Sequence, residues 1–212
     1  MSDSLQQSEY TRHPAERNAT AYILTGGRSQ RMGQDKALLR LPSGMTLLEH
    51  AVATASAVVG DVRILGPRER YATFAWAGKI VEDIYPGCGP LAGIHAALCD
   101  TSTEWNLILA VDMPNVSVDL LRWLLSEAHK TGKQVTVTSC GDQIQPLCGI
   151  YRRDFASVAE AALESGKNKV AASFVPSETR IISEEELSSA GFSPSLLANL
   201  NTPEEFRNTF SR

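Results

Sequence analysis

The chain has 212 residues, of which 43% are hydrophobic and 21% charged. This length suits one substantial α/β domain, and this composition excludes a wholly disordered or fibrous chain. Twenty Lys and Arg against 24 Asp and Glu give a formal net charge of -4. That balance argues against a general binder of nucleic acid or of acidic membranes, although it leaves room for a small local phosphate site.

The cysteines and the apolar segments point to a reducing compartment. Cys88, Cys99, Cys140 and Cys148 form no CxxC pair and match no zinc-ribbon spacing, so we interpret them as buried free thiols. The four histidines also fall in no metal-ligand spacing. No apolar run approaches the roughly 18 residues of a membrane span, and the first twenty residues lack a signal-peptide core. We therefore expect a cytoplasmic protein that binds neither membrane nor nucleic acid.

The first half of the chain begins with a polar segment and then alternates between strands and helices. Residues 1–19 have no apolar period, so we predict a mobile tail ahead of a single domain over residues 20–212. A short apolar run then ends at two glycines, which predicts a buried strand followed by a glycine loop. Further apolar and helical patterns predict, in chain order, a strand at 20–25, a helix at 47–59, a strand at 62–65, a helix at 68–76, a strand at 79–83, a helix at 90–99 and a strand at 105–111.

The second half continues the alternation. Residues 117–131 place their apolar side chains on one helical face, and residues 134–139 alternate as a strand does. Strands are also predicted at 145–151 and 179–183, and helices at 154–165, 167–174 and 203–210.

Alternating strands and helices predict an α/β fold, a mostly parallel twisted sheet with helices on both faces. In such sheets, ligands bind beyond the carboxyl ends of the strands. The loops that carry function should therefore follow strands, and three such loops have unusual residues: 26–36, 83–93 and 112–115.

The first of these loops combines glycine with positive charge. Gly26 and Gly27 directly follow a strand, where backbone N–H groups can approach an anion without hindrance from a Cβ atom. Four basic residues then stand against one acid, Asp35, before residue 41. The pattern is typical of a polyphosphate site, but it is neither a Walker loop nor GxGxxG, and a solvated basic loop is the alternative.

Two aspartates follow other strands. Asp112 comes after the most apolar strand, where a carboxylate can hold Mg²⁺ while phosphates and waters complete the coordination. Asp83 precedes the glycine-rich segment that ends at Gly93. On the residues alone, each aspartate could also be a turn or helix-cap residue.

The run from Leu24 to Lys36, Leu-Thr-Gly-Gly-Arg-Ser-Gln-Arg-Met-Gly-Gln-Asp-Lys, closely resembles the opening signature of the molybdenum cofactor nucleotidyltransferases, especially the guanylyltransferases. Gly-Pro-Leu-Ala-Gly at 89–93 and Val-Asp-Met-Pro at 111–114 resemble two further family segments. Gln-Pro-Leu at 145–147 and Asn-Leu-Asn-Thr-Pro at 199–203 also match. The resemblance spans about residues 20–210 and implies a Rossmann-like nucleotidyltransferase fold.

The resemblance also implies roles for individual residues. Lys36, Arg31 and Asp112 are the implied catalytic residues, with Asp112 as the Mg²⁺ ligand. Gln145 and Asn201 would lie on the pterin or phosphate side, although Asn201 also suits a helix cap. The implied nucleotide-binding residues are Leu24, Thr25, Gly26, Gly27, Lys36, Asp83, Gly89, Pro90, Leu91, Gly93 and Asp112.

Three positions depart from the family pattern. Thr25 stands where the family usually has Ala, and Val111 stands where it has Cys. Gly66 ends a strand at which relatives often carry an Asn that touches the nucleotide. We therefore expect no side-chain contact to the nucleotide from that strand.

The activity that the resemblance implies is transfer of GMP from GTP to the terminal phosphate of molybdenum-bearing molybdopterin, with release of pyrophosphate. GTP and molybdenum-molybdopterin would be the partners, together with molybdenum-insertion proteins or molybdoenzyme chaperones. The alternatives are a cytidylyl-transferring relative, a sugar-1-phosphate nucleotidyltransferase and a non-enzymatic nucleotide-binding regulator. The usual Gly-x-Gly-Thr-Arg of the sugar enzymes is absent from this chain.

Gly26 provides a test of nucleotide choice, since cytidylyl-transferring relatives resemble Leu-Ala-Ala-Gly at this point. A methyl group added in a tight site costs ~1–3 kcal/mol, or roughly 5- to 150-fold in affinity. Gly26→Ala should therefore lower kcat/KM for GTP far more than for CTP, measured alongside a melting curve. A wild type that prefers CTP, or parallel loss of both activities, would refute the guanine assignment.

Overall fold

The computed structural model describes residues 18–25, 35–71 and 79–200. Its centre is a seven-stranded sheet with the order β3-β2-β1-β4-β6-β5-β7. β6 is antiparallel to its neighbours, while the remaining pairings are parallel, so the sheet is mostly parallel as predicted. The strands are β1 (Ala19–Leu24), β2 (Asp61–Leu65), β3 (Ile80–Val81), β4 (Trp105–Ala110), β5 (Val135–Cys140), β6 (Gln143–Arg152) and β7 (Thr179–Ile182).

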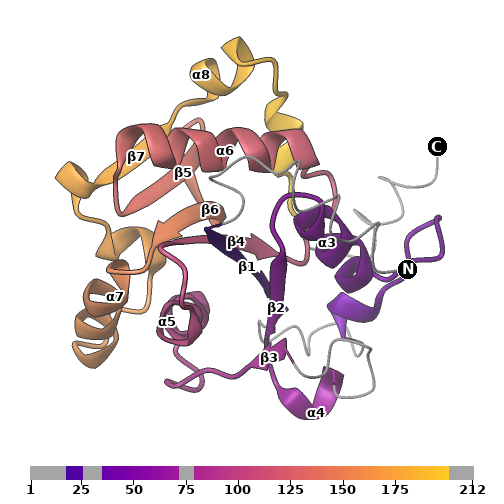
Figure 1. Ribbon diagram of the computed structural model, residues 1–212, viewed down its shortest axis with the longest axis horizontal. Coiled ribbons are helices and arrows are strands. Elements are labelled where there is room, and N and C mark those ends of the chain that lie inside the picture. Colours follow the sequence, from indigo (N-terminus) through magenta and orange to yellow (C-terminus); the bar gives the residue numbers. More distant parts are fainter. Residues whose placement is uncertain (1–17, 26–34, 72–78, 201–212) are drawn as a thin grey trace.

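Helices cover both faces of the sheet (Figure 1). The α-helices are α3 (Leu47–Ser56), α4 (Arg68–Tyr71), α5 (Pro90–Asp100), α6 (Val118–Thr131), α7 (Phe155–Glu164) and α8 (Glu184–Ser189). Short 3₁₀ helices are η2 (Lys36–Leu38), η4 (Val170–Ser173), η5 (Pro176–Glu178) and η6 (Pro194–Leu197). None of the helices in the described part of the chain is long and apolar enough to cross a membrane.

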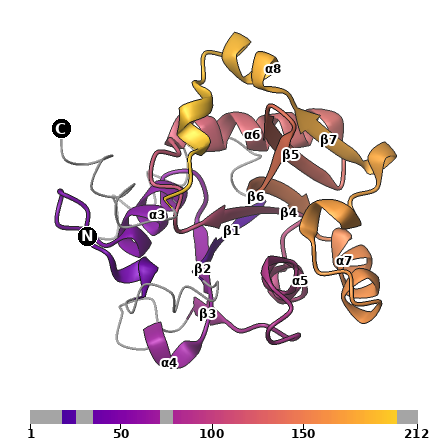
Figure 2. The same cartoon turned by 180° about the vertical axis from the view of Figure 1, so that it is seen from behind.

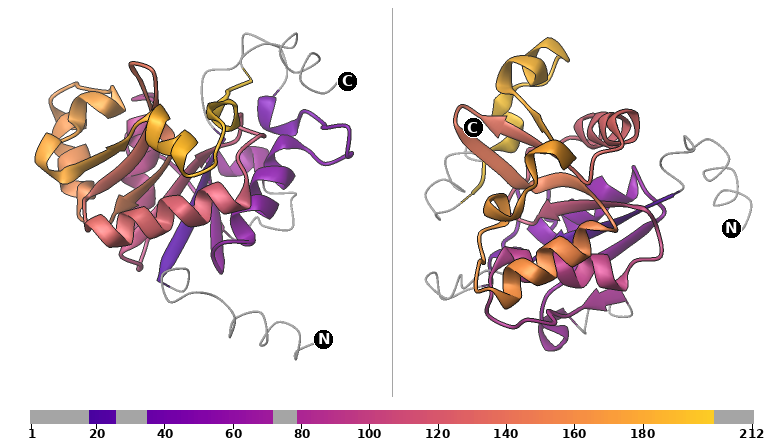
Figure 3. Two further views of the ribbon diagram at one scale, coloured as in Figure 1. Left: turned by 90° about the horizontal axis from the view of Figure 1, so that it is seen from above. Right: turned by 90° about the vertical axis from the view of Figure 1, so that its left-hand side faces the viewer.

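The alternation of side chains along β1 divides the core into two layers. Ala19, Ala21 and Ile23 pack with α3 and α6, whereas Tyr22 and Leu24 pack with α5 and α7. Every residue of β1 is buried, as expected for a central parallel strand covered on both faces. The left panel of Figure 3 shows α6 lying along the sheet, and Figure 2 shows β1 between β2 and β4.

Local signals explain where the helices begin and end. Thr46 and Glu49 form a reciprocal capping box at the start of α3, and Ser117 caps α6. α6 ends at Gly132, which has φ of 66°. Pro90 occupies the first turn of α5, as predicted.

Several predicted elements differ in extent. β3 covers only Ile80–Val81 of the strand predicted at 79–83. The helix predicted over 167–174 is a 3₁₀ turn at Val170–Ser173, and α8 was not predicted. The structure describes the helix predicted at 68–76 only as far as Tyr71, and the segments 1–17 and 203–210 lie outside the described residues.

The burial of the cysteine thiols differs from the prediction that all four are buried. All four cysteines are free, but only Cys148 is buried, and Cys99 is exposed because it lies near the carboxyl end of α5. The described histidines have structural contacts: His50 bonds the carbonyl of Pro114, and His129 bonds that of Leu125.

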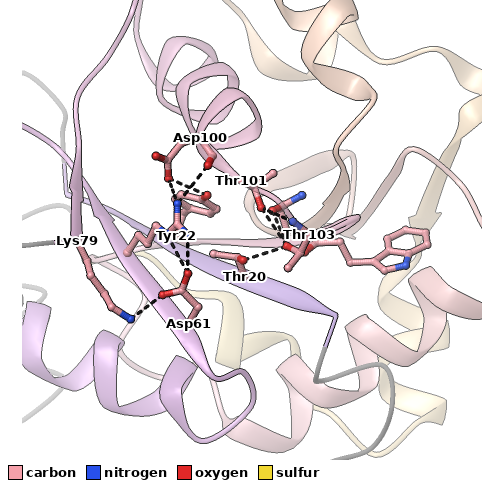
Figure 4. Close-up of polar contacts among 10 residues, drawn as sticks. Thr20, Tyr22, Asp61, Lys79, Asp100, Thr101 and Thr103 are labelled. Carbon is pink, nitrogen blue, oxygen red and sulfur yellow. Dashed lines mark hydrogen bonds and ion pairs between the residues drawn. The ribbon is translucent and has the colours of Figure 1, made fainter.

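A polar cluster joins β1, β2 and α5 (Figure 4). Arg63 bridges the carboxylates of Asp61 and Asp100, with 2.9 Å from its Nε to Asp61 Oδ2. Lys79 Nζ lies 2.6 Å from Asp61 Oδ1, and the Tyr22 hydroxyl donates to Asp100 over 3.1 Å. Asp61 begins β2 and Asp100 ends α5, so this cluster lies at the end of the sheet opposite the carboxyl ends of the parallel strands, which we call the base of the sheet. The cluster links this end of β2 to the end of α5.

Replacing Arg63 with Met should lower the free energy of unfolding at pH 7 by about 1–2 kcal/mol, since two carboxylates lose their shared cation. Burial alone would raise the pKa of Asp61, but hydrogen bonds from Lys79 and Arg63 outweigh it and hold that pKa below its ordinary value. This stabilisation is present above the ordinary aspartate pKa and is lost as the pH falls through the lowered one.

The difference in stability between wild type and Arg63→Met should therefore shrink as the pH is lowered toward about 3. Urea unfolding at several pH values measures it. Lys130→Met, which removes an exposed helical ion pair with Glu127, is the control and should change stability little. A difference that is independent of pH would contradict the prediction.

Candidate active site

The parallel register aligns the ends of the central strands. Leu24 is paired with Leu65 on one side and with Ala110 on the other, and Leu65 is paired with Val81. The segments after β1, β2, β3 and β4 therefore leave the sheet at one edge. This alignment brings together the parts of the chain that the sequence analysis singled out.

Lys36 and Asp112 meet at this edge, although 76 positions separate them in the sequence. Lys36 Nζ donates to Asp112 Oδ2 over 2.8 Å, and the two side chains are 11% and 24% exposed. A pair this shielded interacts more strongly than a surface pair. In the absence of any other charged group, the Lys36 ammonium and the Asp112 carboxylate neutralise each other.

The backbone around Asp112 is fixed on several sides. Val111 N donates to Leu24 O over 3.1 Å, and Leu200 N donates to Asp112 O over 2.8 Å. The ring of His50 bonds Pro114 O at 2.9 Å. These contacts orient the loop after β4 and hold Leu200 against it.

Asp83 lies against the first turn of α5. A Cβ atom on Gly93 would lie 3.5 Å from Asp83 Oδ1 and 2.6 Å from Leu24 Cδ1, so the missing side chain makes room here. Although Asp83 is an exposed residue, partial burial of its carboxylate raises its pKa. Gly89, the N-cap of α5, has φ of 77°, a conformation that favours glycine.

Pro90 and Leu91 also belong to the first turn of α5. Pro90 starts α5 and Leu91 is buried. Because Gly93 in the same turn lies against Leu24 and Asp83, the amino-terminal turn of α5 stands at the carboxyl edge of the sheet. Helix N-termini of this kind favour negatively charged ligands.

Two of the departures from the family pattern touch each other. The Thr25 hydroxyl donates to Leu65 O over 2.7 Å. A Cβ atom on Gly66 would lie only 2.3 Å from that Oγ1 atom, and 3.1 Å from Cε2 of Tyr71. With Thr at position 25, glycine at 66 is the residue that fits, which explains why β2 supplies no side chain at this point.

The other predicted site residues either form no hydrogen bond or ion pair with the side chains of Lys36 and Asp112, or lie outside the described residues. Gln145 precedes Cys148, which is opposite Leu109 in the antiparallel pairing, so it lies toward the carboxyl end of β4. Gln145 is half-buried on β6, next to an irregularity in its pairing with β5. Arg40, one of the four basic residues, donates to Gly44 O within its own turn. Gly26, Gly27, Arg31 and Asn201 lie outside the described residues. Within the described part of the chain, no three His, Cys, Asp or Glu side chains cluster as metal ligands do.

The aligned strand ends bring a lysine and an aspartate together at the carboxyl edge of a mostly parallel sheet, the edge at which α/β folds bind their ligands, and the fold is of the nucleotidyltransferase type. Residues 21–183 match the family model of the MobA-like NTP transferase domain. The chain belongs to this family and is a nucleotidyltransferase.

Curated relatives agree over most of the chain. The sequence is 34% identical over 189 residues to a probable molybdenum cofactor guanylyltransferase of Carboxydothermus hydrogenoformans, covering 89% of this chain and 93% of that one. It is 30% identical over 189 residues to the molybdenum cofactor guanylyltransferase of Syntrophotalea carbinolica, covering 88% of each.

Among solved structures, molybdopterin-guanine dinucleotide biosynthesis protein A of Archaeoglobus fulgidus has a TM-score of 0.77 at 24% identity, covering 91% of this chain and 97% of that one. At that identity, the likeness supports the fold: a mostly parallel sheet with helices, as in nucleotidyltransferases.

The contact between Thr25 and Gly66 can be tested with a double-mutant cycle. Gly66→Ala should lower the free energy of unfolding by about 1–3 kcal/mol because the new methyl group overlaps the Thr25 hydroxyl. Thr25→Ala removes that overlap, so adding Gly66→Ala to it should cost much less. Urea unfolding of the four proteins gives the coupling energy, and additive costs would show that the contact is not the cause.

Proposed function

We propose that this protein transfers GMP from GTP to the terminal phosphate of molybdenum-bearing molybdopterin and releases pyrophosphate. The names of the curated relatives, which match 88–89% of the chain, support this substrate pair. The observation that carries the proposal is the meeting of Lys36 and Asp112 at the carboxyl edge of β1 and β4.

In the proposed reaction, a phosphate oxygen of molybdopterin attacks the α-phosphorus of GTP. A new P–O bond forms while the bond to pyrophosphate breaks and its electron pair leaves with the pyrophosphate oxygen. Because the attacking phosphate is already ionised at neutral pH, no general base is required. Catalysis then depends on alignment and on neutralising charge.

We assign these tasks to Lys36, Arg31 and Asp112. Lys36 holds phosphate oxygens through its ammonium group, and Arg31 supports the same charges from the glycine-rich loop. For this purpose Lys36 exchanges its contact with Asp112 for one with phosphate, and Asp112 then needs another cation.

A magnesium ion fits that requirement. One carboxylate from the protein, with phosphate oxygens and water, is a common donor set for Mg²⁺. Asp112 is the residue that would hold the ion, which supplies positive charge to the phosphates when bound.

The other proposed contacts surround this centre. Leu24, Thr25, Gly26 and Gly27 end or directly follow β1, and we assign them to the nucleotide. Gly89, Pro90, Leu91 and Gly93 present the first turn of α5, with Asp83 beside it.

We assign the pterin or phosphate side to Gln145 and Asn201. The Tyr151 hydroxyl donates to Pro146 O over 2.7 Å, in the part of β6 whose pairing with β5 is irregular and which directly follows Gln145. We further propose that the enzyme works in the cytoplasm and passes its product on through molybdenum-insertion proteins or molybdoenzyme chaperones.

Asp112→Asn tests the assignment of the acid. The substitution conserves shape but removes the charge, so turnover with GTP, Mg²⁺ and molybdenum-molybdopterin should fall by at least about 100-fold while the protein remains folded, with a melting temperature lowered only by the loss of the ion pair to Lys36. Asp119→Asn, which alters an exposed aspartate on α6, is the matched control and should keep full activity. Near-normal turnover by Asp112→Asn would refute the assignment.

A further inference from the structure

A chain of contacts leads from Tyr71, at the end of α4, to the ammonium group of Lys36. The Tyr71 hydroxyl donates to Asp35 Oδ2 over 2.9 Å. The other oxygen of Asp35, Oδ1, accepts from Ala37 N over 3.1 Å and so caps η2, the 3₁₀ helix that begins at Lys36. Lys36 Nζ in turn reaches Asp112. Asp35 is thus the one residue between Tyr71 and the proposed phosphate contact, Lys36.

The position of Tyr71 is strongly determined. The residue is fully buried in the core layer beneath α3. Its ring lies over Gly66, where a Cβ atom would be 3.1 Å from Tyr71 Cε2, and its hydroxyl interacts with Thr25. Burial raises the pKa of Tyr71 to about 12, so the phenol stays protonated and remains a donor near neutral pH.

Asp35 depends on this donor. Its side chain is only 17% exposed, and its Oδ2 atom also faces Arg70, whose Nη1 lies 3.8 Å away on a side chain that is 46% exposed. A bond from a buried, rigid phenol fixes direction better than a long contact from an exposed guanidinium. Without the Tyr71 hydroxyl, the carboxylate keeps a nearby charge but loses the contact that orients its capping oxygen.

We infer that Tyr71 is a positioning residue for the nucleotidyl transfer: acting through Asp35, it holds Lys36 where the phosphates of the nucleotide bind. The inference rests on the proposed function for the identity of the ligand. It assigns a role to α4, a short helix that carries none of the residues in the predicted site. Because displacement of a positioning group by about 1 Å can cost roughly 100-fold in rate, one lost hydrogen bond at this distance should cost roughly 5- to 50-fold in kcat/KM.

Tyr71→Phe tests the role with little change in packing, and Tyr22→Phe is its matched control. Tyr22 is also fully buried and also donates its hydroxyl to a carboxylate, that of Asp100, but in the cluster at the base of the sheet. Both variants should lose similar stability. Only Tyr71→Phe should lower kcat/KM for GTP by roughly 5- to 50-fold and shift the amide resonance of Ala37 in the NMR spectrum.

A double-mutant cycle with Lys36→Met separates positioning from general stability. If Tyr71 acts through Lys36, then Tyr71→Phe should have almost no further effect on kcat/KM once Lys36 is methionine. Additive losses, or equal losses in Tyr71→Phe and Tyr22→Phe, would overturn the inference.

The Ala37 resonance keeps this test separate from the proposed reaction. Suppose that wild type fails to transfer GMP, but the Ala37 amide resonance shifts in Tyr71→Phe and not in Tyr22→Phe. The proposed function then fails, while the link from Tyr71 through Asp35 to η2 stands. If wild type transfers GMP but Ala37 is unchanged in Tyr71→Phe, the inference fails and the proposed function stands.

Discussion

The parallel pairing of β1 with β2 and β4 is the constraint on which the site depends. β1 is buried along its whole length, so its alternating side chains must satisfy two core layers at once. A shift of one residue would turn Tyr22 and Leu24 into the layer that Ile23 now fills. The register is therefore fixed by packing, and it sets Leu24 level with Leu65 and Ala110. Lys36 and Asp112 meet because the core allows only one register between β1 and its neighbouring strands.

Electrostatics then act on this fixed frame. Lys36 and Asp112 balance each other at the carboxyl edge, while the chain as a whole carries a net charge of -4. In the proposed reaction, the polyphosphate of the nucleotide is therefore attracted by local groups, chiefly Lys36 and the amino-terminal turn of α5. Under the proposed function, a nucleotide accompanied by a divalent cation would suit both partners of the ion pair, because phosphate would replace Asp112 at Lys36 and the metal would replace Lys36 at Asp112.

The sequence predicted the fold class and the order of most elements, since these depend on local periodicity, and it singled out Lys36, Asp83 and Asp112, which follow strands that end at this edge. Other features could not be derived in that way. The antiparallel direction of β6 depends on how the chain returns across the sheet, and the hydrogen bond from Leu200 to Asp112 joins segments 88 positions apart. The segment 167–174 has a composition that suits a helix but forms only a 3₁₀ turn, where Val170 is buried against α7 and β6.

Tyr71 illustrates a more general limit on what can be predicted from a sequence. Its neighbours Arg68, Glu69 and Arg70 give α4 a polar sequence with no feature of a binding motif, and the importance of the tyrosine is visible only when Gly66, Thr25 and Asp35 are seen around it. A family signature identifies the groups expected to touch a ligand. The groups that hold them in place are selected by packing within each chain. In this chain, the hydroxyl of Thr25 leaves no room for a side chain at Gly66, and the ring of Tyr71 lies against that glycine. Two of the three departures from the family pattern, Thr25 and Gly66, thus belong to the same local packing arrangement as the inferred support of Lys36.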